Sequence, residues 1–162
     1  MILARGDLGI DKCLCNRIDD YAHSLVLQLK HTSVCFINGY ILSNNEAVAM
    51  RTMHNISAYV QSITMPWCIF ADWNKTTAEV HGTEFAPMLI GRAFVPEDTD
   101  VTCTSGAQRV LDWGLGSPEI ASMLKQSFTD RKVPIRPHTP VYHRFSARPR
   151  HILIQQLSSP AI

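Results

Sequence analysis

The stretch WCIFADWN, residues 67–74, decides how the chain folds. Residues 67–71 form an uninterrupted apolar run of strand length, which is typical of a strand that is covered on both faces. Pro66 stands directly before this run, and the polar residues Asp72 and Asn74 follow it. Layered α/β folds place ligand groups at the ends of buried strands, because the scaffold is rigid there and the edge is open. The stretch therefore predicts a central strand that ends at a candidate site.

The segment before this strand predicts two strands and a long helix. Short apolar runs at residues 25–29 and 34–37, separated by polar residues, are typical of two strands joined by a tight connection. Over residues 46–63, apolar side chains recur every three or four positions and so line one face of a helix. Ser43 and Glu46 have the spacing of a capping box, which predicts the start of this helix.

The segment after the strand is less regular. Residues 75–100 contain two glycines and two prolines and little periodicity, so we expect an irregular loop with one helical turn near Met88. Ser117 precedes Pro118, a pairing that is typical of a helix start. The further strands that we expect cover residues 101–104, 109–115, 141–145 and 152–157, with a proline-containing loop at 133–140. This alternation of strands and helices predicts a layered α/β (α+β) domain.

Length and composition fit one globular domain. The chain has 162 residues, of which 46% are hydrophobic and 18% charged, and a formal net charge of +1. These values exclude a disordered polymer and a uniformly basic nucleic-acid coat. No run reaches the roughly 18 apolar residues of a membrane span, and the N-terminus lacks the pattern of a signal peptide. Five cysteines without a CxxC pair argue against a disulfide framework. We therefore expect an intracellular protein that does not bind membranes.

The charge is unevenly distributed along the chain. After Asp130 there is no acidic residue. The basic residues that follow it are Arg131, Lys132, Arg136, Arg144, Arg148 and Arg150. Such an end attracts polyanions, which makes nucleic acid the expected partner, although basic ends are most often simple solvated surfaces.

Three local patterns follow one another along the chain. They are Ala71-Asp72-Trp73-Asn74, a serine-containing stretch from Ser105 that leads to Leu111-Asp112-Trp113, and RPHTPV at residues 136–141. In this order and spacing they resemble the endonuclease/exonuclease/phosphatase superfamily, the DNase I-like metal-dependent phosphoesterases. The signatures of that superfamily read roughly G-D-F/W-N, I/L-D-Y/W and S-D-H-x-P-V. The resemblance covers nearly the whole chain.

The resemblance implies a role for each residue that matches. Asp72 would orient or deprotonate the attacking water, and Asn74 would position the phosphoryl oxygens. His138 would stabilise charge at the phosphorus centre, with Asp112 holding it in one tautomer. These roles suit phosphodiester hydrolysis, which needs a positioned water and compensation for negative charge on the non-bridging oxygens. The expected substrate-binding residues outside this set are Tyr40 and Arg136.

The implied cofactor is Mg²⁺ or Mn²⁺, held weakly by Asp72 and Asn74. The superfamily's S-D-H is R-P-H here, so Pro137 replaces an aspartate that contacts metal, and proline offers neither a carboxylate nor a backbone N–H. The superfamily's N-terminal asparagine and metal-binding glutamate also lack counterparts, because residues 1–9 resemble the strand that follows them. Glu46 and Glu79 do not fit the missing glutamate, since the first caps a helix and the second falls in the loop after residue 72.

We therefore expect a DNase I-like β-sandwich flanked by helices, with its N-terminal part missing. Residues 1–145 would form the partial domain, and residues 146–162 a C-terminal tail with a final strand. Since the missing strands would cover part of a sheet, an apolar face would be open to self-association.

The leading hypothesis is a phosphodiester hydrolase-like domain of low or absent activity. The alternative is a non-catalytic module that binds nucleic acid or phosphate, and a third possibility is one block of a larger protein. The simpler interpretations also stay open at this point. Asp72 and Asn74 could be ordinary turn residues, and Asp112 could pair with Arg109 or Arg136.

Overall fold

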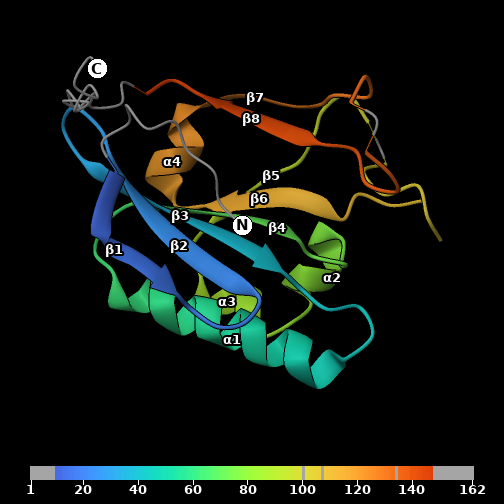
Figure 1. Cartoon of the computed structure of the whole chain (residues 1–162), viewed down its shortest axis with the longest axis horizontal. Helices are drawn as coiled ribbons and strands as arrows, with labels where there is room; N and C mark the ends of the chain where they lie inside the picture. Colours follow the sequence, from blue (N-terminus) through green and yellow to red (C-terminus); the bar gives the residue numbers. More distant parts are fainter. Residues whose placement is uncertain (1–9, 100, 107, 134, 148–162) are drawn as a thin grey trace, which may run out of the picture.

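The strand expected from the WCIFA run lies in the middle of a six-stranded sheet. In the computed structural model, which describes residues 10–99, 101–106, 108–133 and 135–147, β4 (Trp67–Asp72) pairs with two neighbours (Figure 1). It runs parallel to β3 (Ser33–Tyr40) and antiparallel to β6 (Asp112–Gly116). The strand order is β1-β2-β3-β4-β6-β5, where the outer strands are β1 (Ile10–Arg17), β2 (Ala22–Gln28) and β5 (Arg92–Phe94). The prediction of a central buried strand is confirmed.

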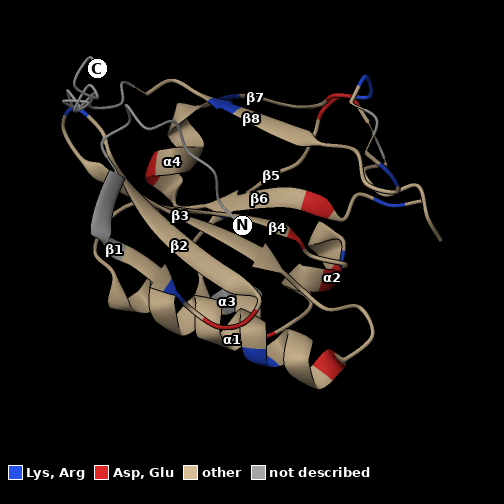
Figure 2. Cartoon of the chain, viewed as in Figure 1, with Lys and Arg blue, Asp and Glu red and all other residues tan. Residues whose placement is uncertain are grey.

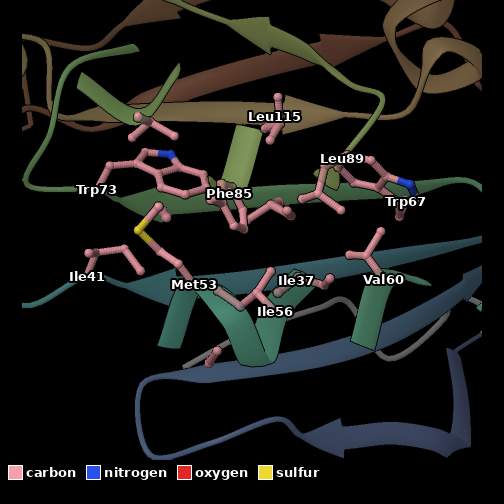
Figure 3. Close-up of a cluster of buried hydrophobic side chains, with 14 of the residues drawn as sticks. Ile37, Ile41, Met53, Ile56, Val60, Trp67, Trp73, Phe85, Leu89 and Leu115 are labelled. Carbon is pink, nitrogen blue, oxygen red and sulfur yellow. The ribbon is translucent and has the colours of Figure 1, made fainter. Parts of the chain in front are cut away.

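One face of this sheet is covered by α1 (Glu46–Ser62), the predicted long helix. Its apolar stripe, including Met53, Ile56 and Val60, packs against the strands in the main core cluster (Figure 3). The capping expectation was wrong: the N-cap is Asn45, whose side chain accepts a hydrogen bond from the backbone N–H of Val48. Because the helix begins at Glu46, that residue takes the first helical position and cannot be the third residue after a Ser43 cap.

The other face carries a second layer, formed by β7 (Leu124–Thr129) and β8 (Val141–Phe145) together with α4 (Pro118–Met123) (Figure 1). A smaller core cluster centred on Val34, Cys68, Phe94 and Ile120 lies on this side, with Phe70 and Phe145 packed against it. The two layers confirm the predicted α/β architecture with one sheet stacked on another.

The segment after β4 is more ordered than expected. It contains α2 (Thr77–His81), α3 (Phe85–Met88) and β5, of which only the turn near Met88 was predicted. α2 starts with a capping box between Thr76 and Glu79, so Glu79 lies on a helix and not in a loop. These elements were missed because three to five residues are too few to display a periodicity.

Two further segments differ from the expected secondary structure. The segment 101–104 is not a strand of either sheet; Cys103 makes isolated bridges to Arg109 and to His138. β7 was not predicted, because its LKQSFT sequence has few strand-forming residues and gains its structure by pairing with β8. The expected final strand at 152–157 falls outside the described residues, and the division at residue 146 stays a prediction.

The expected apolar opening stays a prediction, and the apolar residues of β2 and β3 on the side of the second layer are where it would lie. Leu25, Leu27 and Phe36 are half-buried there among the described residues, whereas the neighbouring Val34 is buried. Self-association through this surface stays a prediction. None of the described helices combines the length and the apolar character needed to cross a membrane.

Candidate active site at the ends of β4 and β6

Two carboxylates lie side by side where β4 ends and β6 begins. Asp72 and Asp112 are partners in the antiparallel register of these strands, so both side chains point to the same face of the sheet, the one that carries the second layer. Figure 2 shows acidic positions at these two strand ends. Forty residues of sequence separate the two aspartates, and the register alone brings them together.

His138 completes the cluster from the loop before β8. Its Nδ1 donates a hydrogen bond of 2.8 Å to Oδ2 of Asp112, and its Nε2 lies 3.7 Å from Oδ2 of Asp72. One ligand atom from each of the three residues lies within 4.8 Å of the others, and all three residues are half-buried. The imidazole is therefore oriented by one carboxylate and faces the other.

The surroundings of Asp72 and His138 shift the pKa values of these two groups. Burial, reinforced by the negative charge of Asp112, raises the pKa of Asp72 above its usual value, although the N–H of Asn74 and the charge of His138 oppose the shift. Burial alone would lower the pKa of His138, but the hydrogen bond and charge of Asp112 and the charge of Asp72 outweigh it and raise that pKa. The site therefore favours a proton on the imidazole and strengthens Asp72 as a base.

A buried threonine ties the loops of the site together. Oγ1 of Thr102 accepts hydrogen bonds from the backbone N–H groups of Leu111 and Asp112, at 2.9 and 3.0 Å. The carbonyl of Thr102 accepts a 2.7 Å bond from the N–H of Thr139, the residue after His138. Thr102 thus fixes the backbone on both sides of the Asp112–His138 pair. Sequence reasoning missed it, because nothing in the local pattern marks its hydroxyl as buried.

Two buried tryptophans hold the strand ends that carry the aspartates. Trp73 and Trp113, which directly follow Asp72 and Asp112, stack with ring centroids 4.5 Å apart and are almost completely buried. The indole N–H of Trp73 donates to the carbonyl of Trp113, and that of Trp113 donates to the carbonyl of Lys75. This buried stack limits how far the two strand ends can move.

Asn74 acts on the backbone around Asp72. Its N–H donates a 3.0 Å hydrogen bond to Oδ1 of Asp72, and its side-chain amide donates a 2.8 Å bond to the carbonyl of Ile41. The residue has a positive φ of 49°, a conformation that asparagine tolerates better than most residues. Asn74 therefore joins the end of β4 to the segment after β3.

A pocket of about 210 Å³ opens beside the two aspartates. Its lining includes Asn38, which the sequence pattern placed at a strand end without assigning it a role, and His143, which sequence reasoning did not assign to the site. The His143 ring stacks on Phe70 at 4.9 Å, and its Nδ1 shares a 2.8 Å hydrogen bond with Oγ of Ser127. Burial lowers the pKa of His143 to about 4. For His143, the alternation of β8 could have shown that its side chain points to the same side as Val141 and Phe145.

The two predicted substrate-binding residues, Tyr40 and Arg136, are not among the three clustered side chains. Tyr40 ends β3 as the register partner of Asp72, but its side chain is 43% exposed. Arg136 is exposed, and its guanidinium donates to the carbonyl of its neighbour Ile135. The alternative pairing of Asp112 with arginine is wrong, since Arg109 pairs instead with Glu79, at 2.7 Å.

Comparison with solved structures relates the fold of the chain to known proteins. No protein-family model matches the chain, and no curated protein matches it either. Many solved structures do match, among them the endonuclease domain of TRAS1, a telomere-specific non-LTR retrotransposon, with a TM-score of 0.71 and 9% identity over 88% of the chain. The catalytic domain of Xenopus laevis APE2 matches with a TM-score of 0.59 and 16% identity over 79% of the chain. The catalytic domain of human Nocturnin matches with a TM-score of 0.54 and 15% identity over 78% of the chain.

The chain has the DNase I-like fold. At such low identities the likeness shows the fold alone. The chain spans 70% of the TRAS1 domain, 55% of the APE2 chain and 52% of the Nocturnin chain. In this DNase I-like fold, the cluster of Asp72, Asp112 and His138 lies at one end of the stacked sheets, where the loops that follow and precede the strands meet.

Proposed function

We propose that the chain carries a metal-dependent phosphodiester hydrolase site of the nuclease/phosphatase type, with low turnover as the chain stands. The observation that carries the proposal is the compact cluster of Asp112, His138 and Asp72, in which one carboxylate orients an imidazole that faces a second carboxylate. Support comes from the fold, which the chain shares with an endonuclease domain, a 3′-5′ exonuclease and a mannosyl-6-phosphatase.

Each side chain has a distinct task in this proposal. Asp72, whose raised pKa makes it a stronger base, orients the attacking water and accepts its proton. His138 directs Nε2 toward the non-bridging oxygens and, when protonated, balances their negative charge. Asp112 fixes the Nδ1–H tautomer of His138 and favours its cationic form. Asn74 positions Asp72 through its backbone N–H.

The donor set fits one loosely held Mg²⁺ or Mn²⁺ ion. Mg²⁺ is usually held by one or two carboxylates together with water and substrate phosphate. Oδ2 of Asp72, which faces Nε2 of His138 at 3.7 Å, would take this role together with Oδ1 of Asn74, which accepts no hydrogen bond among the described residues. When bound, such an ion stabilises charge on the leaving oxygen.

Low turnover follows from the missing carboxylates. Pro137 stands where the resemblance expects an aspartate, and no glutamate of the described residues joins the cluster. Glu46 pairs with Lys75, and Glu79 pairs with Arg109 and caps α2. A site with one free carboxylate holds a divalent ion weakly, so the ion is expected to bind together with substrate phosphate.

The test is hydrolysis of bis(p-nitrophenyl) phosphate and of plasmid and single-stranded DNA, with Mg²⁺ or Mn²⁺ and with EDTA. We expect slow, EDTA-sensitive turnover that Asp72→Asn and His138→Gln reduce by about a hundredfold or more. Glu97→Gln, a surface charge change outside the cluster, serves as the matched control and should leave the rate unchanged. Turnover that survives both site substitutions or persists in EDTA would contradict the proposal.

The proposed substrate class is nucleic acid, because exposed basic residues lie in the loops around the site. Arg131, Lys132 and Arg136 all belong to the segment between β7 and β8 that also carries His138. If single strands are bound but not hydrolysed, the alternative of a non-catalytic binding module replaces the hydrolase proposal.

A further inference from the structure

The β7–β8 sheet presents an aromatic pair with a cation on one of its faces. Phe128 and Tyr142 are direct partners in the antiparallel register, and their rings stack with centroids 5.5 Å apart and planes 15° apart. The guanidinium carbon of Arg144 lies 5.9 Å from the centroid of the Phe128 ring. Tyr142 is 43% exposed and Arg144 is exposed, so this group is open to a ligand.

This face points away from the six-stranded sheet. Neighbouring residues of a strand point to opposite faces. Ser127 and His143, the next pair in the register, point inward, because Ser127 is buried and His143 stacks on Phe70 of β4. Phe128 and Tyr142 must therefore point outward. Their stack is a surface feature and does not fill the core between the layers.

The charges on and around this face are mostly positive. β7 and β8 contain Lys125 and Arg144 and no acidic residue (Figure 2). Exposed Arg131, Lys132 and Arg136 follow in the connection between the strands. Three acidic residues lie next to β7: the exposed Glu97, whose backbone N–H donates to the carbonyl of Ser127, Asp98, which accepts hydrogen bonds from Thr129, and Asp130, which accepts one from the N–H of Lys132.

We propose that this outer face, defined by Phe128, Tyr142 and Arg144, binds a single-stranded nucleic acid. A base stacks on the open face of the Tyr142 ring, whose other face stacks on Phe128, and a neighbouring phosphate contacts Arg144. Exposed aromatic rings flanked by cations bind single strands with little sequence preference, because every base offers a π-face. Duplex bases are already stacked on one another and cannot use the ring.

The outer face lies close to the candidate active site along the chain. Tyr142 comes four residues after His138, a distance of at most about 13 Å along an extended strand. A strand held at Tyr142 can therefore extend its backbone to the Asp72–His138 cluster. In this respect the inference rests on the proposed function, since it names the form of its substrate, but the binding itself requires no hydrolysis.

The test measures binding in EDTA, where no metal-dependent turnover takes place, so failure of the hydrolase proposal does not affect the result. Fluorescence anisotropy with labelled single-stranded DNA, single-stranded RNA and duplex DNA of equal length compares the wild type with four variants. Tyr142→Ala should weaken single-strand binding about tenfold, and Tyr142→Phe should leave it within about twofold. Arg144→Gln should reduce the slope of log K against log salt concentration by about 0.7, the value for one phosphate contact.

The matched control is Arg51→Gln, which removes an exposed charge from α1 on the far side of the six-stranded sheet. It should leave affinity and salt slope unchanged. Circular dichroism melts check that each variant is folded. Tyr142→Phe retains an aromatic ring stacked on Phe128, so it remains a folded comparison if Tyr142→Ala unfolds. The proposal is supported if DNA or RNA single strands bind, Tyr142→Ala weakens that binding, and Arg144→Gln lowers the salt slope. Equal affinity of Tyr142→Ala, equal binding of duplex, or no binding at low salt overturns it.

Discussion

Oδ2 of Asp112 accepts a 2.8 Å hydrogen bond from Nδ1 of His138, a residue 26 positions further along the chain. The bond fixes which imidazole nitrogen carries the proton, and it leaves Nε2 3.7 Å from Oδ2 of Asp72. Two carboxylates thus act on one ring in different ways. One orients the ring, and the other shares with it the space where a substrate phosphate is proposed to bind.

The first prediction concerns this hydrogen bond. Asp112→Asn keeps the shape of the side chain but removes its charge, so the pKa of His138 should fall from its raised value toward or below the ordinary one. NMR titration of the His138 ring measures this pKa without any need for activity. Asp98→Asn, a carboxylate that bonds to Thr129 instead, is the control and should leave the His138 titration unchanged. An unaltered His138 pKa in Asp112→Asn would show that the pair does not form in solution.

The second prediction concerns acid stability through His143. Its pKa is about 4 in the folded chain and about 6.5 when unfolded, so the unfolded state binds more protons between these values. Stability is therefore full above about pH 6.5 and falls as the pH drops, by about 2 kcal/mol at pH 5. His143→Phe keeps the stacking on Phe70 and does not titrate. Urea unfolding at pH 7 and pH 5 should show a smaller loss for this variant than for the wild type, and parallel losses would contradict the assignment.

The third prediction concerns Thr102. Thr102→Val removes a buried hydroxyl and leaves the N–H groups of Leu111 and Asp112 without their acceptor. The free energy of unfolding should fall by about 2 kcal/mol or more. Thr102→Ser keeps the oxygen and should recover most of that loss. Since the Thr102 hydroxyl also holds the backbone N–H of Asp112, the partner of His138, the His138 NMR signals should shift in the valine variant and stay close to wild type in the serine variant.

The fourth prediction concerns the close packing between the layers. A Cβ added at Gly116 would lie 2.6 Å from Cζ of Phe94, a buried ring of the smaller core cluster. Gly116→Ala should therefore displace that ring and destabilise the chain by about 1–3 kcal/mol. At Gly82 the nearest atoms to an added Cβ are 3.5 Å away, so Gly82→Ala should be tolerated. Thermal melts of the two variants make the comparison, and equal stabilities would show that β5 can move away from β6.

Much of the scaffold could be predicted because its signals are local. The apolar run at 67–71 and the three-to-four spacing over 46–63 are properties of neighbouring residues, and they predicted β4 and α1 within a residue at either end. β7 could not be predicted in the same way. Its sequence is mostly polar, and it becomes a strand only because β8 supplies the hydrogen-bond partners and the six-stranded sheet covers one of its faces.

The sequence by itself determined which chemical groups this protein has and which of them end a buried strand. Asp72, Asp112 and His138 were identified as candidates from short patterns around each of them. Only the tertiary structure decided how they act on one another. The antiparallel register of β4 with β6 sets the two aspartates side by side, and the loop held by Thr102 turns the imidazole between them. Register and loop packing depend on contacts between distant segments, so no local pattern encodes the distances that set the charge and tautomer of the site.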